Sequence, residues 1–415
     1  MSKRISLSLV AILTISVAQA DDTLAVAKNF DEIFTKGKIS GQIDLMYSGH
    51  EIKNNEDPYS TAIGGQLKYE TAEMYGFSAG AEFTTVHEID GLSGDTPAKR
   101  AELMVSANGS YTQLSQAYLN YGYEGLNLRL GRQMLITPLA DNDHYRIIDN
   151  TFEAAIATYD IADVSLMLGY INRWQGTDTG LDNGQAWQDT GKDGTYFSGI
   201  SYTSDLLDTS AWYYDISEAS AGNTATGNVA NKSIYLDATL HLSFSENFTL
   251  DTSVQYLNQS QSDNSGIDAD IYGLLLDATV YKNLELQLDY NRRNADDDKT
   301  SFSGFGGGTL NTSSDNMILD AIVGGDVDTM LASISYAVSE LSLYYTYGVY
   351  QRDETINLVK EDIHEQSIGA NYSVNDNLTL STIVTINDNK EDTTSNAIYT
   401  GGDFTNIRVF LEYTF

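Results

Sequence analysis

The last twelve residues of the chain, FTNIRVFLEYTF at positions 404–415, alternate between two kinds of side chain. One row holds Ile407, Val409, Leu411, Tyr413 and Phe415, and the other holds Asn406, Arg408, Phe410, Glu412 and Thr414. Successive side chains of a strand point to opposite faces. The segment therefore predicts a strand with one apolar, aromatic face and one mostly polar face.

The same alternation recurs along most of the chain. A tilted strand needs about ten residues to cross a bilayer, and the alternating segments have this length. We predict an all-β fold, a transmembrane antiparallel β-barrel of about 18 strands. The expected spans are 37–47, 60–72, 76–87, 112–122, 125–133, 152–160, 163–173, 195–203, 209–217, 232–243, 247–258, 270–281, 284–294, 330–338, 341–350, 365–373, 377–388 and 404–415.

The connections between these segments alternate strictly between long and short, which is typical of barrels with long external loops and tight periplasmic turns. A secreted β-sandwich, propeller or β-helix remains the soluble alternative, but those folds have no reason to alternate connection lengths. The long connections contain all three prolines, where a missing N–H does not interrupt a ladder: Pro58, Pro97 and Pro138.

The N-terminus has the features of an export signal. Lys3 and Arg4 precede an apolar stretch, residues 5–17, that is too short for a transmembrane helix, and Ala18-Gln19-Ala20 fits the small-x-small cleavage pattern. We expect cleavage after Ala20 and apolar spacing typical of a short helix within residues 22–36. The chain then divides into a signal peptide at 1–20, a short periplasmic N-terminal segment at 21–36 and a transmembrane β-barrel at 37–415.

The composition excludes several classes of partner. The chain holds 23 Lys and Arg against 58 Asp and Glu, a formal net charge of −35. A nucleic-acid-binding protein needs cationic groups to displace counterions, and no basic run is present. Without cysteine there are no disulfides and no thiolate metal ligands. The acidity fits solvated loops, and binding of divalent cations by those loops stays open.

A barrel of this width is too wide for side chains to fill, so it leaves an aqueous channel. We expect the third long connection, about 134–151, to fold inward and narrow the pore. Its charged residues are then candidates for the constriction: Asp141, Asp143 and Arg146.

Strand parity assigns charged residues to the lumen. The expected bases are Lys68, Arg129, Arg173, Arg293 and Arg408. The expected acids are Asp44, Glu70, Glu82, Asp237, Asp251, Asp277, Glu285, Asp289 and Glu412. Arg132 is also a constriction candidate, although parity turns it outward unless a bulge intervenes. Because both signs occur, a transverse field is expected, and anion or cation preference stays open.

Residues 125–155 resemble the constriction-loop region of the OprD-type (Opr family) substrate-channel porins, in which a strand ending in Gly-Lys/Arg-Gln leads into a loop with Pro, Asp and Arg. Residues 30–47 are similar to the amino-terminal strand of epsilonproteobacterial-type members, and Phe415 matches the terminal signal read by barrel-assembly machinery. The matching positions in the loop region are Gly131-Arg132-Gln133, Pro138, Asp143 and Arg146.

This resemblance implies an eighteen-stranded outer-membrane channel for small, often carboxylate-bearing solutes. The chain departs from the family in having few basic lumen residues, which puts the solute in doubt. We expect a porin, not an enzyme, that gives passive diffusion of small hydrophilic solutes and ions, including carboxylates or amino acids. The expected surroundings are outer-membrane lipid and lipopolysaccharide, and both a monomer and a homotrimer fit the sequence.

Four other features bear on different chemistry. His241 and Ser243 share a strand face, which suggests a barrel hydrolase of the phospholipase type, and the large acidic loops suggest an adhesin. His144 lies beside Asp141 and Asp143, but a hydrated loop is favoured over a metal site, so no metal and no cofactor are expected. The glycines at 304 and 306–308 indicate a flexible external loop, because no βαβ context surrounds them.

Overall fold

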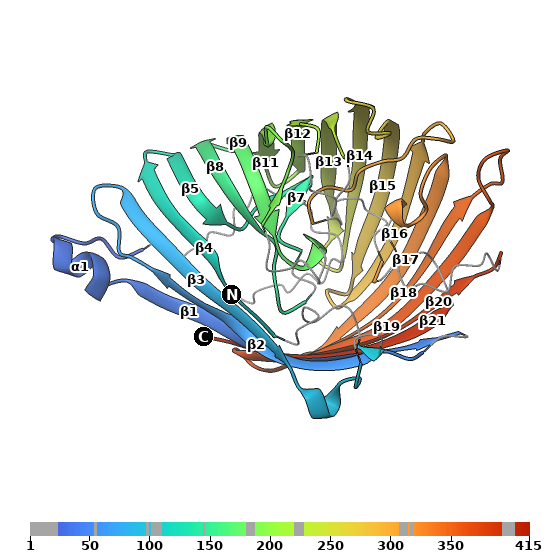
Figure 1. Ribbon diagram of the computed structural model, residues 1–415, viewed down its shortest axis with the longest axis horizontal. Coiled ribbons are helices and arrows are strands. Elements are labelled where there is room, and N and C mark those ends of the chain that lie inside the picture. Colours follow the sequence, from blue (N-terminus) through green and yellow to red (C-terminus); the bar gives the residue numbers. More distant parts are fainter. Residues whose placement is uncertain are drawn as a thin grey trace.

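In a computed structural model the chain forms a closed, 18-stranded antiparallel β-barrel (Figure 1). The structure describes residues 24–53, 56–96, 99–100, 110–143, 146–179, 187–219, 228–306, 314–315, 317, 319–391 and 403–415. The expected signal peptide and its cleavage site lie outside the described residues, as do Pro97 and His144.

The alternating segments are confirmed as strands. They are β1 (Lys38–Ile52), β2 (Tyr59–Glu70), β3 (Phe77–Glu88), β4 (Ser110–Tyr123), β5 (Leu126–Gln133), β8 (Thr151–Ile161), β9 (Val164–Gln175), β11 (Thr195–Thr203), β12 (Leu207–Ile216), β13 (Asn231–Ser245), β14 (Phe248–Gln261), β15 (Ala269–Val280), β16 (Leu284–Asn294), β17 (Val327–Val338), β18 (Leu341–Arg352), β19 (Glu361–Asn375), β20 (Leu378–Asn389) and β21 (Phe404–Thr414). Smaller elements are α1 (Phe30–Thr35), β6 (Ile136–Thr137), β7 (Ala140–Asp141), β10 (Gln188–Asp189), η1 (Asp90–Leu92), η3 (Thr177–Thr179) and η4 (Leu319–Ala321).

Pairing between the first and last strands closes the cylinder. Tyr47 of β1 lies opposite Val409 of β21, and the ladder runs from Gln42 to Ile52. Beyond it, Gly41 and Phe415 exchange two backbone hydrogen bonds of 3.0 Å. Closure leaves no strand edge without a partner, which is the condition for a sheet to cross lipid.

The two ends of the barrel differ as the sequence predicts. Tight turns join the strands at one end, here called the turn end, and long connections join them at the other, the loop end. The β4–β5 turn illustrates the local chemistry, because Glu124 and Gly125 adopt φ angles of 44° and 85°, a left-handed conformation that glycine adopts at no steric cost. Pro58 and Pro138 both lie at the loop end, outside the long strands.

The two faces of the sheet also differ. Apolar side chains such as Leu130, Leu168 and Leu288, which are 64%, 63% and 59% exposed, cover the outer face. Polar side chains such as Asp44 and Asn406 point inward and are fully buried. Among the described residues no helix is long and apolar enough to span a bilayer.

The inside of the loop half is packed with protein. The connection between β5 and β8 folds inward as expected and forms the β6–β7 hairpin, seen within the ring of strands in Figure 1. The connection between β16 and β17 also enters, contrary to the expectation of a flexible external loop. Its Phe305 is 1% exposed and pairs with Ala140 of the hairpin.

Gly304 shows how closely these two loops approach. A Cβ atom at this position would lie 2.8 Å from the Cα atom of Leu139, and the φ angle of Gly304 is +111°. Both conditions require glycine. The two loops therefore form one apolar cluster inside the barrel, which also includes Trp174, Met317 and Tyr350.

The expected short helix is α1, outside the barrel at the turn end. Asn29 caps it by accepting a 3.0 Å hydrogen bond from the Glu32 N–H. Tyr69 of β2 donates a 2.7 Å hydrogen bond to the carbonyl of Phe34, and the N–H of Ala72 donates to Ile33. The helix therefore lies against the β2–β3 turn.

The apolar outer face predicts that introducing a charged side chain lowers the stability of the barrel by an amount that depends on its position. Leu288→Arg, at mid-height of β16, should destabilise the barrel by about 2–4 kcal/mol, because an arginine there meets hydrocarbon. Ser333→Arg is the matched control, since Ser333 lies on the inner face of the adjacent strand. Urea unfolding in lipid vesicles measures both, and equal losses of unfolding free energy would contradict the assignment of faces.

Candidate pore lining and constriction

One side of the turn half carries two basic side chains. Lys68 of β2 and Arg129 of β5 both lie over the ring of Tyr118, at 5.7 and 4.4 Å from its centroid. Lys68 Nζ is 3.3 Å from a carboxylate oxygen of Glu70, and Arg129 Nε donates to Asn120 at 3.2 Å. The aromatic face favours cations, so this basic cluster is held in place on the wall.

The strands from β12 to β16 carry a row of acidic side chains on their inner face, here called the acidic wall. A histidine, His241, lies among these acids, with its Nε2 atom 3.1 Å from a carboxylate oxygen of Asp208 and its Nδ1 atom 3.0 Å from one of Asp251. Asp251 is in register with Asp277 on the next strand. The acidic wall consists of Asp208, Asp237, Asp251, Asp277, Glu285 and Asp289.

The basic cluster and the acidic wall lie across the lumen from each other. In the order of strands around the barrel, β2–β5 and β12–β16 are separated by about half the circumference. Figure 1 shows β3 and β4 on the left of the barrel and β15 and β16 on the right. The turn half therefore has positive side chains on one side of the lumen and negative side chains on the other.

The inward hairpin brings the predicted loop residues into the lumen. Asp143 lies within electrostatic range of Arg146, of Arg408 on β21 and of Asp178 on η3. Burial raises the pKa of Asp141 to about 6. Burial also raises the pKa of Asp143, and the negative charge of Asp178 adds to this effect.

Arg408 marks a contact that the sequence did not predict. It is 7% exposed and forms an ion pair with Asp315, which belongs to the β16–β17 connection. Asp315 also accepts a 2.5 Å hydrogen bond from Thr385 of β20. The second inward loop therefore crosses the lumen and reaches the wall formed by β20 and β21.

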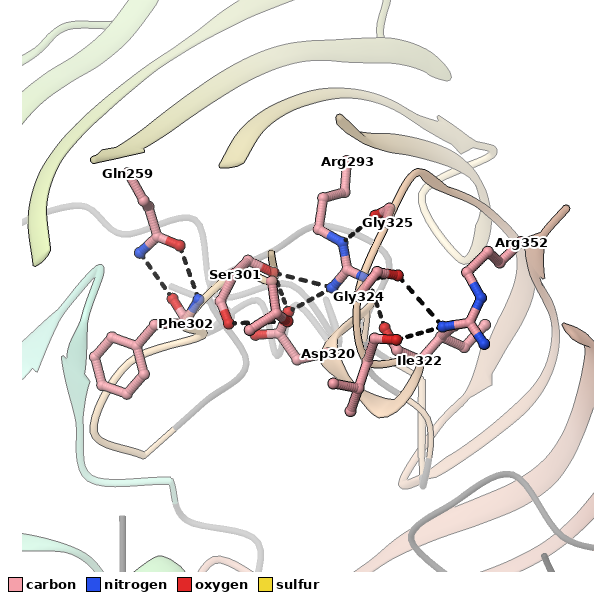
Figure 2. A network of polar contacts seen from close by, with 11 residues as sticks. Gln259, Arg293, Ser301, Phe302, Asp320, Ile322, Gly324, Gly325 and Arg352 are labelled. Atoms are coloured by element: carbon pink, nitrogen blue, oxygen red, sulfur yellow. Dashed lines mark hydrogen bonds and ion pairs between the residues drawn. The ribbon is translucent and has the colours of Figure 1, made fainter. Parts of the chain in front are cut away.

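Two arginines fix the other side of this loop (Figure 2). The fully buried Arg293 donates to the carbonyl oxygens of Ile322, Gly324 and Gly325 at 2.5, 3.0 and 3.0 Å. Its Nη1 also lies 3.2 Å from both Ser301 Oγ and Asp320 Oδ1. Arg352 donates to the carbonyls of Val323, Gly324 and Val359.

A side-chain amide supports the same loop further along the wall. Gln259 accepts from the N–H of Phe302 at 2.8 Å and donates to its carbonyl at 3.0 Å, the same pair of bonds that a neighbouring strand would supply. Residues 301–306 and 319–326 are therefore held by wall side chains in addition to contacts within the loop, such as that between Ser301 and Asp320.

Arg132 and Arg173 are not in the lumen. The register between β8 and β9 shifts at Glu153/Ala154, so that Glu153 lies opposite Arg173 and Asn172 is an extra residue. This bulge reverses the parity, and Arg173 points outward with Glu153, at 2.8 Å. Arg132 lies opposite Glu153 from the other side and also points outward. Neither belongs to the constriction, and the expectation that Arg173 faces inward is wrong.

His241 does not form a hydrolytic pair. Both of its ring nitrogens contact carboxylates, those of Asp208 and Asp251, which leaves no nitrogen to accept a proton from Ser243. Within the part of the chain that the structure describes, no group of three or more His, Asp or Glu side chains has the arrangement of a metal site.

The barrel is similar to several solved structures. No protein-family model matches the chain, and no curated protein matches it. Pseudomonas aeruginosa OpdK, solved with vanillate, has a TM-score of 0.75 and 14% sequence identity over 92% of this chain and 99% of that one. Acinetobacter baumannii OccAB2 has a TM-score of 0.76 and 15% identity over 92% and 99%. The likeness shows a closed 18-stranded barrel of the same fold.

The acid in the hairpin predicts a pH-dependent pore. Raising the pH through about 6 deprotonates Asp141, so the constriction gains negative charge and the reversal potential in a salt gradient should move toward cation preference. Asp141→Asn should remove most of this movement between pH 5 and 7. Asp376→Asn, in the β19–β20 turn, should leave it unchanged, and an identical pH profile for Asp141→Asn would refute the assignment.

The buried arginine predicts how the second loop is held. Arg293→Ala leaves three loop carbonyls without their charged donor and should release the loop, which raises single-channel conductance and exposes the chain to trypsin after Lys299. Limited proteolysis and bilayer recordings check both effects. Arg293→Lys keeps the charge without the planar fork and should lie between wild type and alanine. Unchanged cleavage in Arg293→Ala would contradict this role.

Proposed function

We propose that the chain is a passive channel of the outer membrane for small hydrophilic solutes and ions. The observation that carries this proposal is the closed barrel with an apolar outer face and a charged lumen narrowed by two inward loops. Eighteen strands enclose more space than wall side chains fill. The remaining space is lined by polar side chains, so it can carry water and hydrophilic solutes between the aqueous compartments on the two sides of the membrane.

The outer-membrane location is supported by the ends of the strands. Tyr170 and Tyr196 form an outward aromatic pair near the loop end, with ring centroids 4.8 Å apart, and Tyr413 stacks on Phe415 at the turn end. Rings at both levels are typical of the two membrane interfaces. An export signal at residues 1–20 and recognition of Phe415 by barrel-assembly machinery belong to the same proposal.

The basic cluster and the acidic wall on opposite sides of the lumen favour amino acids over simple carboxylates as solutes. A zwitterion can turn its carboxylate toward Lys68 and Arg129 while its ammonium faces the acidic wall across the lumen. Vanillate, the molecule in the OpdK structure, is a simple carboxylate. Such an anion would interact favourably with the basic cluster alone. Liposome-swelling rates for neutral zwitterions and for benzoate-like anions distinguish the two classes.

The acidic wall predicts a cation preference that single variants should shift in opposite directions. Asp251→Asn and Asp277→Asn should move the reversal potential toward anions, whereas Lys68→Ala and Arg129→Ala should move it toward cations, because each removes one wall charge. Planar-bilayer recording in a salt gradient measures this. Absence of ohmic steps would refute the channel itself, and reversal potentials unmoved by all four variants would refute the transverse field.

The hydrolase and adhesin alternatives have no comparable support. Calcium-dependent lipid hydrolysis by the purified protein, lost in Ser243→Ala, would favour the enzyme over the channel. The two carboxylate contacts of His241 argue against that outcome.

A further inference from the structure

The outer face of the barrel carries a shallow apolar groove of about 450 Å³. It lies on β8, β9, β11 and β12, where small side chains leave space between larger rings. Cross-strand register places these residues in two rows on the outer face. The small members are Ala155, Ala157 and Ser198, and the rings are Tyr170, Tyr196 and Tyr213.

The groove ends, toward the loop end, at two outward arginines, Arg132 of β5 and Arg173, which the β9 bulge turns outward. The guanidinium groups of Arg132 and Arg173 both lie over the ring of Trp187, at 4.7 and 5.6 Å from its centroid. Tyr170 borders the groove and donates to Asn172 at 3.4 Å, and Asn172 donates to Glu153 at 3.1 Å. The groove and the arginine pair are therefore continuous.

The two guanidinium groups have more donors than the structure uses. Arg173 donates from Nη2 to Glu153 at 2.8 Å, while its buried Nε has no acceptor. Among the described residues, Arg132 donates to the carbonyl of Leu114, at 3.4 Å, and its Nε is 3.8 Å from Glu153. Each guanidinium carries five N–H donors. Asp189 lies opposite Arg173 in the β9–β10 ladder, so these arginines are distinguished by their surplus of N–H donors and not by a net positive charge.

The arginine pair lies near the upper edge of the apolar band, from which a long side chain extends to the level of a lipid headgroup. Ile161, at the turn end of β8, is 56% exposed on the outer face. Glu153 is eight residues further along the strand, which at about 3.4 Å per residue and a tilt of roughly 40° is about 20 Å higher. The apolar band of such barrels is about 25 Å tall. An acyl chain in the groove would thus place a phosphate near the arginines.

We propose that this surface, the groove together with Arg132, Arg173 and Trp187, binds a phosphorylated, multiply acylated lipid of the outer leaflet. The proposal rests on the outer-membrane location given above. One acyl chain fills the groove, and the phosphate accepts hydrogen bonds from the two guanidinium groups, whose planar fork matches phosphate oxygens. Lipid A, the membrane anchor of lipopolysaccharide, has this chemistry.

A third arginine on the outer face provides the contrast. Arg292 of β16 forms ion pairs with two carboxylates, those of Asp326 and Asp328. Its side chain is 33% exposed, close to the 30% and 36% of Arg132 and Arg173. Its guanidinium is therefore occupied, and Arg292→Ala is a matched control for loss of an outward positive charge.

Native mass spectrometry of the delipidated, detergent-solubilised mature protein with diphosphoryl hexa-acyl lipid A tests the proposal. The double variant Arg132→Ala/Arg173→Ala should bind at least about tenfold more weakly, the loss expected for two charge-assisted contacts. Arg132→Lys/Arg173→Lys should bind with intermediate strength. Ala157→Phe, which fills the groove, should weaken binding as well, and Arg292→Ala should leave it unchanged.

Three results would overturn the proposal: undiminished binding in the double alanine variant, equal binding of dephosphorylated lipid A, or equal loss in Arg292→Ala. A change of oligomer mass in Ala157→Phe without loss of lipid would make the groove a contact between copies of this chain instead. Single-channel conductance of every variant is recorded in parallel. Channels that conduct normally but bind no lipid separate failure of this proposal from failure of the channel.

Discussion

Closure of the hydrogen-bond ladder is the constraint on which the rest of the structure depends. Hydrocarbon offers no partner for a backbone N–H or carbonyl, so a sheet that crosses a bilayer must end where it begins. The pairing of β21 with β1 meets this condition. Once the cylinder is closed, each strand separates lipid from lumen, and the period-two alternation follows for every strand. A modest content of apolar residues then suffices for a membrane-spanning barrel, because only the outer face must be apolar.

A closed cylinder of this circumference creates a second requirement, since its wall side chains do not fill it. In the loop half the chain fills the space with two connections that pack against each other at Ala140 and Phe305. Their carbonyls are buried away from water and need donors. Arg293, Arg352 and Gln259 supply these donors from the wall. The desolvation of a buried guanidinium is offset by several acceptors, which is why arginine occupies this position.

The sequence predicts those features that are local. Strands and tight turns follow from periodicity and turn residues, whereas the inward hairpin is expected from the resemblance of residues 125–155 to a porin constriction loop. Strand parity does not predict the bulge at Asn172. One inserted residue reverses the face to which every later side chain on the strand points. The ion pair between Asp315 and Arg408 joins positions 93 residues apart, and nothing near either residue indicates its partner. The inward path of residues 301–306 could not be predicted either, because it depends on contacts with residues far away in the sequence.

The bulge also connects the two sides of the wall. Without it, Arg173 would add a positive charge to the lumen next to the constriction, and with it the lumen loses that charge while the outer face gains a hydrogen-bond donor group. The acidic wall is then opposed mainly by Lys68 and Arg129. One extra residue in β9 thus removes a positive charge from the lumen and places it on the lipid side, next to the proposed lipid-binding surface. In a one-layer wall, every change of register acts on both sides, so the charge of the lumen and the charge of the outer face are not independent properties.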